Sequence, residues 1–415
     1  MDKEKLLLIE SEMISAKGHF LDYLIETSNY FKNKKNIIWF LNKNFKSKNL
    51  YLPEFCNIKK ILYSNNFKRK ENKFFYYLEE ILLFIKNFYD ILYFIKFFFH
   101  NKKKLINFLS ALIRNYLIIP RYFKSFYMEF LKLGLSSNDS IFFQSARRKD
   151  IALVFFLSSI EHYNLPKIHL RVFLPPNNRF KDFYFYLNKI KHLLENKIFV
   201  YTEDGFKKEL LSQKVGTNNL INTTTPIFTF NNRNYTKKHF VGFIGEARLN
   251  KGFDKIPSYI SKFANLDNNV NFIIQFSKTD KSTEPTKKIL YQMQSQFKNI
   301  DIIEKYCDYA EYRDILKKIT IMPFIYDKIH MNNTNSGIFY SCIANEIITI
   351  IPTECDYLKK ILSPNSFEEA NEIEEFVNHT SKIIQNYSIY LDNAKKSSKK
   401  LKSITDNGSI IRNIG

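Results

Sequence analysis

Short apolar runs alternate with helical patterns along this chain, and this alternation limits its fold more than any other feature. A polar stretch rich in Asn and Thr, Asn218–Lys238, interrupts the alternation, and the same pattern then starts again. Strands that alternate with helices form parallel sheets covered by helices on both faces. We therefore predict an α/β protein of two Rossmann-like, doubly wound βα domains that face a cleft, with ligands at the carboxyl ends of the strands.

The pattern predicts strands and helices in both halves. The strands are Lys5–Ile9, Asn36–Leu41, Ile58–Tyr63, Ser140–Gln144, Ile168–Phe173 and Ile198–Tyr201, then Phe240–Ile244, Val270–Phe276, Ile300–Ile303, Ile319–Pro323 and Ile347–Pro352. The helices are Phe20–Phe31, Ile151–Ile160, Phe183–Leu194, Thr202–Ser212 with Thr202 as cap, Ile256–Phe263, Ile289–Phe297, Tyr309–Lys317 and Gly337–Ala344. Acidic Glu368–Glu375 is assigned to a further helix, and Lys395–Lys402 to a solvated tail.

The chain's 415 residues exceed one typical hydrophobic core. We expect one domain at 1–228, a second at 239–385, and a C-terminal helix and basic tail at 386–415. The four cysteines lie far apart without a zinc-binding spacing, which favours a reducing compartment. The start, MDKEKLLLIESE, is too short an apolar run for a signal peptide, and no run approaches the about 18 apolar residues of a spanning helix. We therefore expect a cytoplasmic protein.

The net charge of +22 is concentrated in the first half, where residues 1–230 hold 37 Lys and Arg against 20 Asp and Glu. This excess favours an anionic surface or substrate. A composition rich in Lys, Asn, Ile, Phe and Tyr is also typical of AT-rich coding sequence, which leaves a compositional origin open. Nucleic acid is the least favoured partner, because no recognised nucleic-acid module is present.

Residues 73–135 combine aromatic and aliphatic side chains with recurring Lys and Arg. We predict a helical region of two or three amphipathic helices inserted in the first domain. Aromatic residues with basic flanks are typical of a helix that lies on an anionic lipid surface. The alternative is a helical hairpin whose aromatic side chains fill the domain core.

The stretch HFVGFIGEARLNKG, residues 239–252, is the strongest candidate for a binding site. An apolar run ends at Gly245, the cations Arg248 and Lys251 follow, and a helical pattern begins after Gly252. Unpaired N–H groups at such a turn, together with two cations, suit a diphosphate. The stretch is neither a Walker loop nor a GxGxxG fingerprint, and a surface turn with solvated cations is the alternative.

A second candidate is NNTNSGIF, residues 332–339, after the predicted strand Ile319–Pro323. Ser336 and Gly337 would begin a helix and offer a hydroxyl and backbone N–H groups to an anion. On its own this pattern is more typical of an ordinary N-cap than of an anion site. Together with Gly245, Arg248 and Lys251 it would place two helix starts at one diphosphate.

These motifs resemble those of GT-B glycosyltransferases of group 1, or family 4. The family's donor-binding domain begins with G-x-x-R-x-x-KG-F-x-x-L-P, which GEARLNKGFDKIP resembles, and its next strand resembles FIIQFS at 272–277. Its later motif runs P-x-x-Y, then SG-x-F-x-E-A-x-x-x-G-K-P-x-V-x-P, and resembles PFIYDKIHMNNTNSGIFYSCIANEIITIIP. In the first half, KGHFLDYL resembles the family's GGH-x-x-x-Y loop, and KIHLRVF and VYTEDGFKKEL resemble its later strands and T-E helix.

The resemblance implies that Gly245, Arg248 and Lys251 bind the donor diphosphate, and that Ser336 and Gly337 add donors to the same phosphates. It implies that His19, on the acceptor-side loop, contacts the acceptor or the transferred sugar as a catalytic residue. Gln275 is a weaker candidate for contact with the donor sugar or base. No cofactor and no bound metal are expected, in line with the absence of a DxD triplet.

The chain departs from the family at several positions. Ser341 stands where the family's Glu binds the nucleotide ribose, Cys342 replaces Ala, and Glu346 replaces the Gly of G-K-P. Lys17 replaces the first Gly of GGH. The missing ribose carboxylate fits altered donor handling, an alignment shifted toward Glu346, or an inactive domain.

The resemblance thus implies a metal-independent, retaining glycosyltransferase. It would move a sugar from a nucleotide-sugar donor to an acceptor hydroxyl of a cell-surface glycan, such as a lipopolysaccharide, or of a lipid-linked saccharide. The enzyme would be cytoplasmic and peripheral on the inner face of the cell membrane through residues 73–135. The alternative is a non-catalytic GT-B-like protein that binds a partner enzyme or a glycan.

Overall fold

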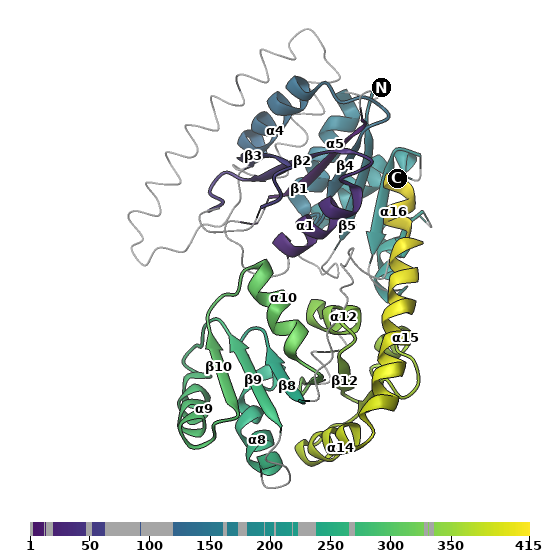
Figure 1. Cartoon of the computed structure of the whole chain (residues 1–415). Coiled ribbons are helices and arrows are strands. Elements are labelled where there is room, and N and C mark those ends of the chain that lie inside the picture. The colour runs from purple at the N-terminus through teal and green to yellow at the C-terminus, as the bar shows by residue number, and fades with distance from the viewer. Residues whose placement is uncertain are drawn as a thin grey trace. The chain divides into compact units, whose positions relative to one another are not determined.

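The computed structural model describes residues 3–11, 13, 20–46, 52–62, 92, 119–160, 164–172, 181–194, 196–202, 205–217, 219–222, 238–264, 270–327, 331 and 336–415. The chain divides into two compact units, shown in Figure 1. Unit 1 comprises Met1–Pro226 and Gly408–Gly415, and unit 2 comprises Ile227–Asn407. Unit 1 is therefore built from two separate stretches of sequence.

Unit 1 contains a parallel seven-stranded sheet in the order β3-β2-β1-β4-β5-β6-β7. Its strands are β1 (Lys5–Glu10), β2 (Asn36–Asn42), β3 (Asn57–Leu62), β4 (Ser140–Phe143), β5 (Lys167–Val172), β6 (Ile198–Thr202) and β7 (Ile221–Asn222). Its helices are α1 (Phe20–Phe31), α4 (Ile119–Leu133), α5 (Arg148–Ile160), α6 (Lys181–Ile190) with the 3-10 turn η2 (Lys191–Leu193), α7 (Gly205–Val215) and α16 (Ser409–Ile414). Both sheet faces are covered, since α4 to α7 share one apolar core with the sheet, while α1 and α16 contact β2 and β5.

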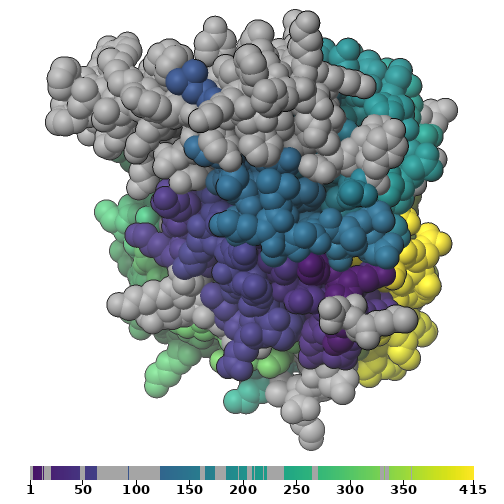
Figure 2. All heavy atoms as spheres, turned by 90° about the horizontal axis from the view of Figure 1, so that it is seen from above, coloured from purple at the N-terminus to yellow at the C-terminus, as the bar shows by residue number. Residues whose placement is uncertain are grey.

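Helix α4 bears on the two hypotheses for residues 73–135. Five of its aromatic side chains are buried in the core of unit 1: Tyr122, Phe123, Phe126, Tyr127 and Phe130. The helix lies beside β3, where the blue and purple segments adjoin in Figure 2. For this helix the structure supports the alternative of core-filling aromatics. Apart from residue 92, positions 73–118 of the predicted helical region lie outside the described residues.

Unit 2 contains a parallel six-stranded sheet in the order β10-β9-β8-β11-β12-β13. Its strands are β8 (Phe240–Ile244), β9 (Asn271–Phe276), β10 (Ile300–Glu304), β11 (Ile321–Pro323), β12 (Ile348–Ile351) and β13 (Phe367–Glu369). Its helices are the 3-10 turns η3 (Leu249–Lys251) and η4 (Phe253–Lys255), then α8 (Ile256–Ala264), α9 (Glu284–Gln296), α10 (Tyr309–Lys318), α12 (Gly337–Ala344), α13 (Asp356–Lys359), α14 (Ile373–Gln385) and α15 (Tyr387–Asp406). Separate apolar clusters lie on its two faces.

The predicted α/β class with two doubly wound parallel sheets is confirmed. Three local predictions were wrong. Thr202 ends β6 instead of capping a helix, and α7 begins at Gly205. The acidic segment Glu368–Glu375 contains the end of β13 before α14 begins. Residues 395–402 belong to α15, where Ser397, Ser398 and Leu401 are buried, and do not form a solvated tail.

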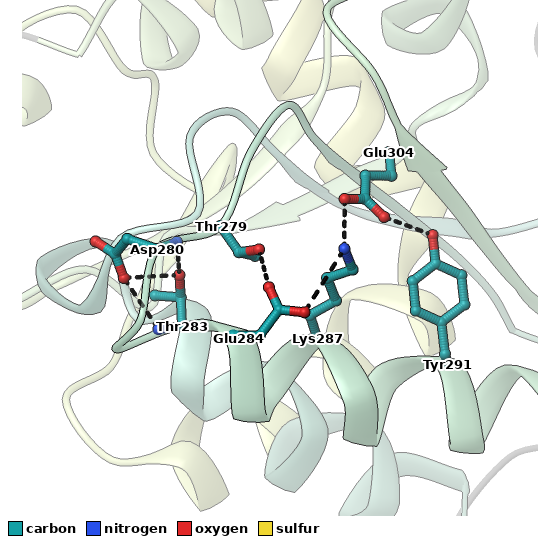
Figure 3. A network of polar contacts seen from close by, with 7 residues as sticks. All are labelled: Thr279, Asp280, Thr283, Glu284, Lys287, Tyr291 and Glu304. Atoms are coloured by element: carbon teal, nitrogen blue, oxygen red, sulfur yellow. Dashed lines mark hydrogen bonds and ion pairs between the residues drawn. The ribbon is translucent and has the colours of Figure 1, made fainter.

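A polar network fixes the segment between β9 and α9 (Figure 3). Asp280 accepts hydrogen bonds from the backbone N–H groups of Ser282 and Thr283. Lys287 on α9 pairs with Glu304 at the end of β10 over 2.6 Å, and Tyr291 donates to the same carboxylate. These contacts join the start of α9 to the carboxyl ends of two neighbouring strands.

No helix within the described ranges is long and apolar enough to cross a membrane.

The C-terminal helix α16 closes one face of unit 1. Asn413 donates a hydrogen bond to the Tyr201 hydroxyl over 3.1 Å. The same hydroxyl lies 2.9 Å from Nδ1 of His169, so it can accept from Asn413 and donate to a neutral imidazole. His169 is fully buried between Phe199 and Tyr201, and burial lowers its pKa from 6.5 to about 3. The fold therefore requires His169 to stay neutral.

Neutral His169 makes the stability of unit 1 depend on pH. The unfolded chain takes up a proton at this residue below pH 6.5, whereas the folded chain does so only near pH 3. The free energy of unfolding therefore falls as the pH is lowered from 6.5 toward 3, by up to about 1.4 kcal/mol per pH unit. We expect His169→Gln to flatten this slope in urea denaturation curves recorded between pH 7 and pH 4. Equal slopes for the variant and the wild type would contradict the assignment.

Candidate functional site

Gln275 anchors the carboxyl edge of the unit 2 sheet. Its side-chain oxygen and backbone oxygen both accept from the N–H of Gly245, over 3.2 and 3.0 Å. Its amide nitrogen donates to the backbone oxygen of Lys305 over 2.8 Å. One buried side chain thus ties together the ends of β8, β9 and β10. The predicted contact of Gln275 with a donor sugar or base must coexist with this structural role.

The glycine turn after β8 lies directly against helix α12. Gly245 has φ +126°, and a Cβ atom there would lie 2.8 Å from Cδ1 of Ile338 in the first turn of α12. The two candidate motifs, which lie far apart in the sequence, therefore meet in space. This brings together Gly245 and the Ser336–Gly337 helix start.

Gly252 lets the cationic loop pass close to β11. Its φ is +67°, and a Cβ atom there would lie 2.0 Å from the backbone oxygen of Ile325. No other residue type fits this space without moving the backbone. The close approach holds Lys251 over the segment that follows β11.

The two cations of the loop differ in their surroundings. Arg248 forms an ion pair with Glu246, and both side chains are about half exposed, at 54% and 52%. Lys251 is more enclosed, and its pKa is lowered by burial, raised by Glu246 and lowered by Arg248. Its ammonium group lies 5.8 Å from the centre of the Tyr326 ring, within the range of a cation–π interaction. Arg248 is therefore free to turn toward a ligand, whereas Lys251 is held in place.

Ser336 caps helix α12 by accepting a hydrogen bond from the N–H of Phe339. Burial raises the pKa of the Tyr326 phenol, and the Ser336 hydroxyl lowers it by a smaller amount. The N-terminal N–H groups of α12 point beyond the carboxyl edge of the sheet, where they can bind an anion.

A small, open pocket lies at this edge. Its lining includes the polar residues Glu246, Lys251, Gln275 and Tyr326 and the apolar residues Phe253 and Met322. Polar and apolar side chains thus line one pocket, as in many small-molecule sites. Within the described ranges, no three His, Cys, Asp or Glu side chains gather into a metal-binding group.

Known structures resemble the whole chain, although no protein-family model matches the sequence and no curated protein does. Sucrose-phosphate synthase from Thermosynechococcus elongatus superposes with a TM-score of 0.58 at 10% identity, covering 97% of this chain and 95% of that one. An α,α-trehalose 6-phosphate synthase from Burkholderia multivorans gives 0.55 at 7%, covering 99% and 96%. HepE of Anabaena, in complex with UDP and glucose, gives 0.53 at 10%, covering 97% of both chains. The chain has the GT-B fold.

Two of the predicted donor residues lie on or just after helix α12: Ser341 on the helix and Glu346 after its end. Ser341, in the position of the family's ribose-binding Glu, donates its hydroxyl to the backbone oxygen of Gly337 over 3.0 Å. Glu346 follows the other end of this eight-residue helix, about 12 Å along its axis, at the amino edge of the sheet. The structure therefore does not bring Glu346 to the diphosphate motifs, and a shifted alignment does not supply the missing carboxylate.

Glu346 adopts a backbone conformation that is uncommon for its residue type. Its φ is +57°, in the left-handed region that favours glycine, the residue that the resembled motif has at this position. Glutamate adopts this conformation at a cost in free energy.

His19, the predicted acceptor-side residue, lies outside the described residues. Sequence reasoning overlooked Tyr326, although it is the Tyr of the matched P-x-x-Y motif. It also overlooked Glu246, which directly follows the glycine turn. No spacing rule indicates that the Lys251 ammonium lies over the Tyr326 ring, because these residues lie on separate segments.

The close approach at Gly252 predicts a large effect of a single methyl group. We expect Gly252→Ala to lower the free energy of unfolding by about 2–5 kcal/mol, from left-handed strain and overlap with Ile325. The matched control is Gly134→Ala, since Gly134 has φ +53° and open space around it. It should cost about 1–2 kcal/mol, the strain alone. Equal losses in urea denaturation would contradict the close approach.

The left-handed backbone at Glu346 predicts that glycine at this position stabilises the protein. We expect Glu346→Gly to raise the free energy of unfolding by about 0.5–1 kcal/mol. Relief of the left-handed strain stabilises the folded chain, and this gain exceeds the loss caused by the greater freedom of glycine in the unfolded chain. Glu346→Ala keeps the strain and is the control. If both substitutions stabilise the protein, the effect comes from removal of the carboxylate and not from the backbone.

Proposed function

We propose that this chain is a glycosyltransferase that moves a sugar from a nucleotide-sugar donor to an acceptor hydroxyl. The supporting observation is that the Gly245 turn packs on the first turn of α12, while Arg248 and Lys251 follow on the same loop. Two cations and a helix start form a site for a diphosphate. The GT-B fold of the whole chain supports the same assignment.

In the proposed reaction the donor diphosphate contacts Arg248, Lys251, Ser336 and the free N–H groups of α12. The half-exposed Arg248–Glu246 pair is weak, so a phosphate displaces the carboxylate at small cost. As the bond between the sugar and the phosphate oxygen breaks, negative charge develops on that oxygen, and the cations stabilise it. They supply the positive charge that a metal ion supplies in other transferases.

The proposed stereochemical course is retention. The acceptor oxygen attacks from the face that the phosphate leaves, and the leaving phosphate takes the acceptor proton. The acceptor is proposed to be a cell-surface glycan or a lipid-linked saccharide, handled in the cytoplasm. Its support is the basic excess of residues 1–230.

A second candidate function is a non-catalytic GT-B-like protein. Its support is Ser341, whose hydroxyl is bonded to its own helix and replaces a carboxylate. Such a protein would bind a glycan or a partner enzyme and would show no donor turnover.

The test is a thermal-shift panel of UDP, GDP, ADP and their sugar derivatives. A ligand that binds only the native state stabilises it by about 2.7 kcal/mol at a hundred times its Kd. We expect one base to raise the midpoint, and Arg248→Ala and Lys251→Ala to weaken that nucleotide at least about tenfold, since each removes a charged contact.

Lys288→Ala is the matched control, because Lys288 is an exposed lysine on α9. It should bind the nucleotide as the wild type does. A panel without any shift would overturn donor binding. Nucleotide binding without release of sugar from the matching nucleotide sugar, even with glycan acceptors present, would favour the non-catalytic candidate.

A further inference from the structure

Tyr326 lies between the loop after β8 and helix α12. It follows β11 and lines the pocket at the carboxyl edge of the sheet. The ammonium group of Lys251 lies over the face of its ring, 5.8 Å from the ring centre. One aromatic ring therefore supports a cation of the loop after β8.

A chain of aromatic rings fixes Tyr326 in turn. Its ring meets Phe324 edge-on at 5.3 Å, and Phe324 meets Phe339 of α12 edge-on at 5.8 Å. Phe324 and Phe339 are fully buried. The ring of Tyr326 thus cannot move without disturbing the first turn of α12, and Lys251 shares that restraint.

The charges that act on Lys251 lie on its own loop. Glu246 raises the pKa of its ammonium group and Arg248 lowers it, so the two act in opposite directions. The Glu246 carboxylate is already paired with Arg248. An aromatic face stabilises a partly buried ammonium without neutralising it, so the charge remains available to a phosphate.

We propose that Tyr326 is a positioning residue: its ring holds the Lys251 ammonium in the position that a donor diphosphate requires, and its packing on Phe324 fixes that ring relative to α12. The inference rests on the proposed function and extends it to a residue that need not touch the ligand. The ring carries this role, and the hydroxyl is not needed for it.

The test compares Tyr326→Leu and Tyr326→Phe by calorimetric titration with inorganic pyrophosphate and with UDP. Loss of the ring should weaken both ligands roughly 5- to 30-fold, the range of a cation–π contact. Tyr326→Phe keeps the ring and should retain most of the affinity. Tyr291→Leu makes the same change on α9, away from the loop, and should bind as the wild type does.

The pH profile separates positioning from a purely structural role. Without the ring, the ammonium is less stabilised, so its pKa falls and the affinity of Tyr326→Leu declines at a lower pH than that of the wild type. Tyr326→Phe should follow the wild type. Titration of the ligand itself is common to all variants and cancels in the comparison.

Each outcome decides a separate point. If wild-type protein binds neither pyrophosphate nor UDP, GDP or ADP, the proposed function fails and the inference fails with it. If the wild type binds and Tyr326→Leu binds equally well, or weakens without a change in its pH profile, only the inference is overturned. Melting curves of the free variants identify any that fail to fold. If Tyr326→Leu does not fold, Tyr326→Phe decides: retained affinity with an unchanged pH profile supports the role of the ring, and loss of most of the affinity assigns the role to the hydroxyl and overturns the inference.

Discussion

The candidate site depends on one buried amide. The side chain of Gln275 joins the ends of three strands, because it accepts from Gly245 and donates to the backbone of Lys305. Strand ends have unpaired backbone groups, and a buried one without a partner costs free energy. By satisfying these groups, Gln275 fixes the direction in which the chain leaves β8. The loop that carries both cations begins in that direction.

Sheet order explains how distant motifs come together. β8 and β11 are neighbours in the sheet although two strands, β9 and β10, and the helices α8, α9 and α10 separate them in the sequence. The loops after the two strands therefore leave from adjacent points of the carboxyl edge. Gly245 and Gly252 allow these loops to approach to a distance that a side chain would prevent. The geometry of the candidate site thus depends on close approach of the backbone as well as on charge.

Sequence reasoning succeeded where one local signal determines the outcome. Phe240–Ile244 and Gly337–Ala344 were predicted with the observed bounds, because a continuous apolar run and an N-cap serine are local features. β13 was missed, since its three residues are only partly buried and read as part of an acidic helix. The roles of Gln275 and Tyr326 were not predictable, because they arise from contacts between strands whose order the sequence does not state. The spacing of Ser341 matched its motif, but its bond to Gly337 depends on the rotamer.

The discontinuity of unit 1 has a consequence for synthesis of the protein. Helix α16 covers β5 and buries Ile410, Ile411 and Ile414, and Asn413 completes the contacts of Tyr201. A ribosome makes these residues only after all of unit 2. During translation the nascent unit 1 therefore exposes the apolar face that α16 later covers, while unit 2 can already form its sheet. Most of unit 1 is therefore synthesised first, but unit 1 completes its fold only after unit 2 has been synthesised.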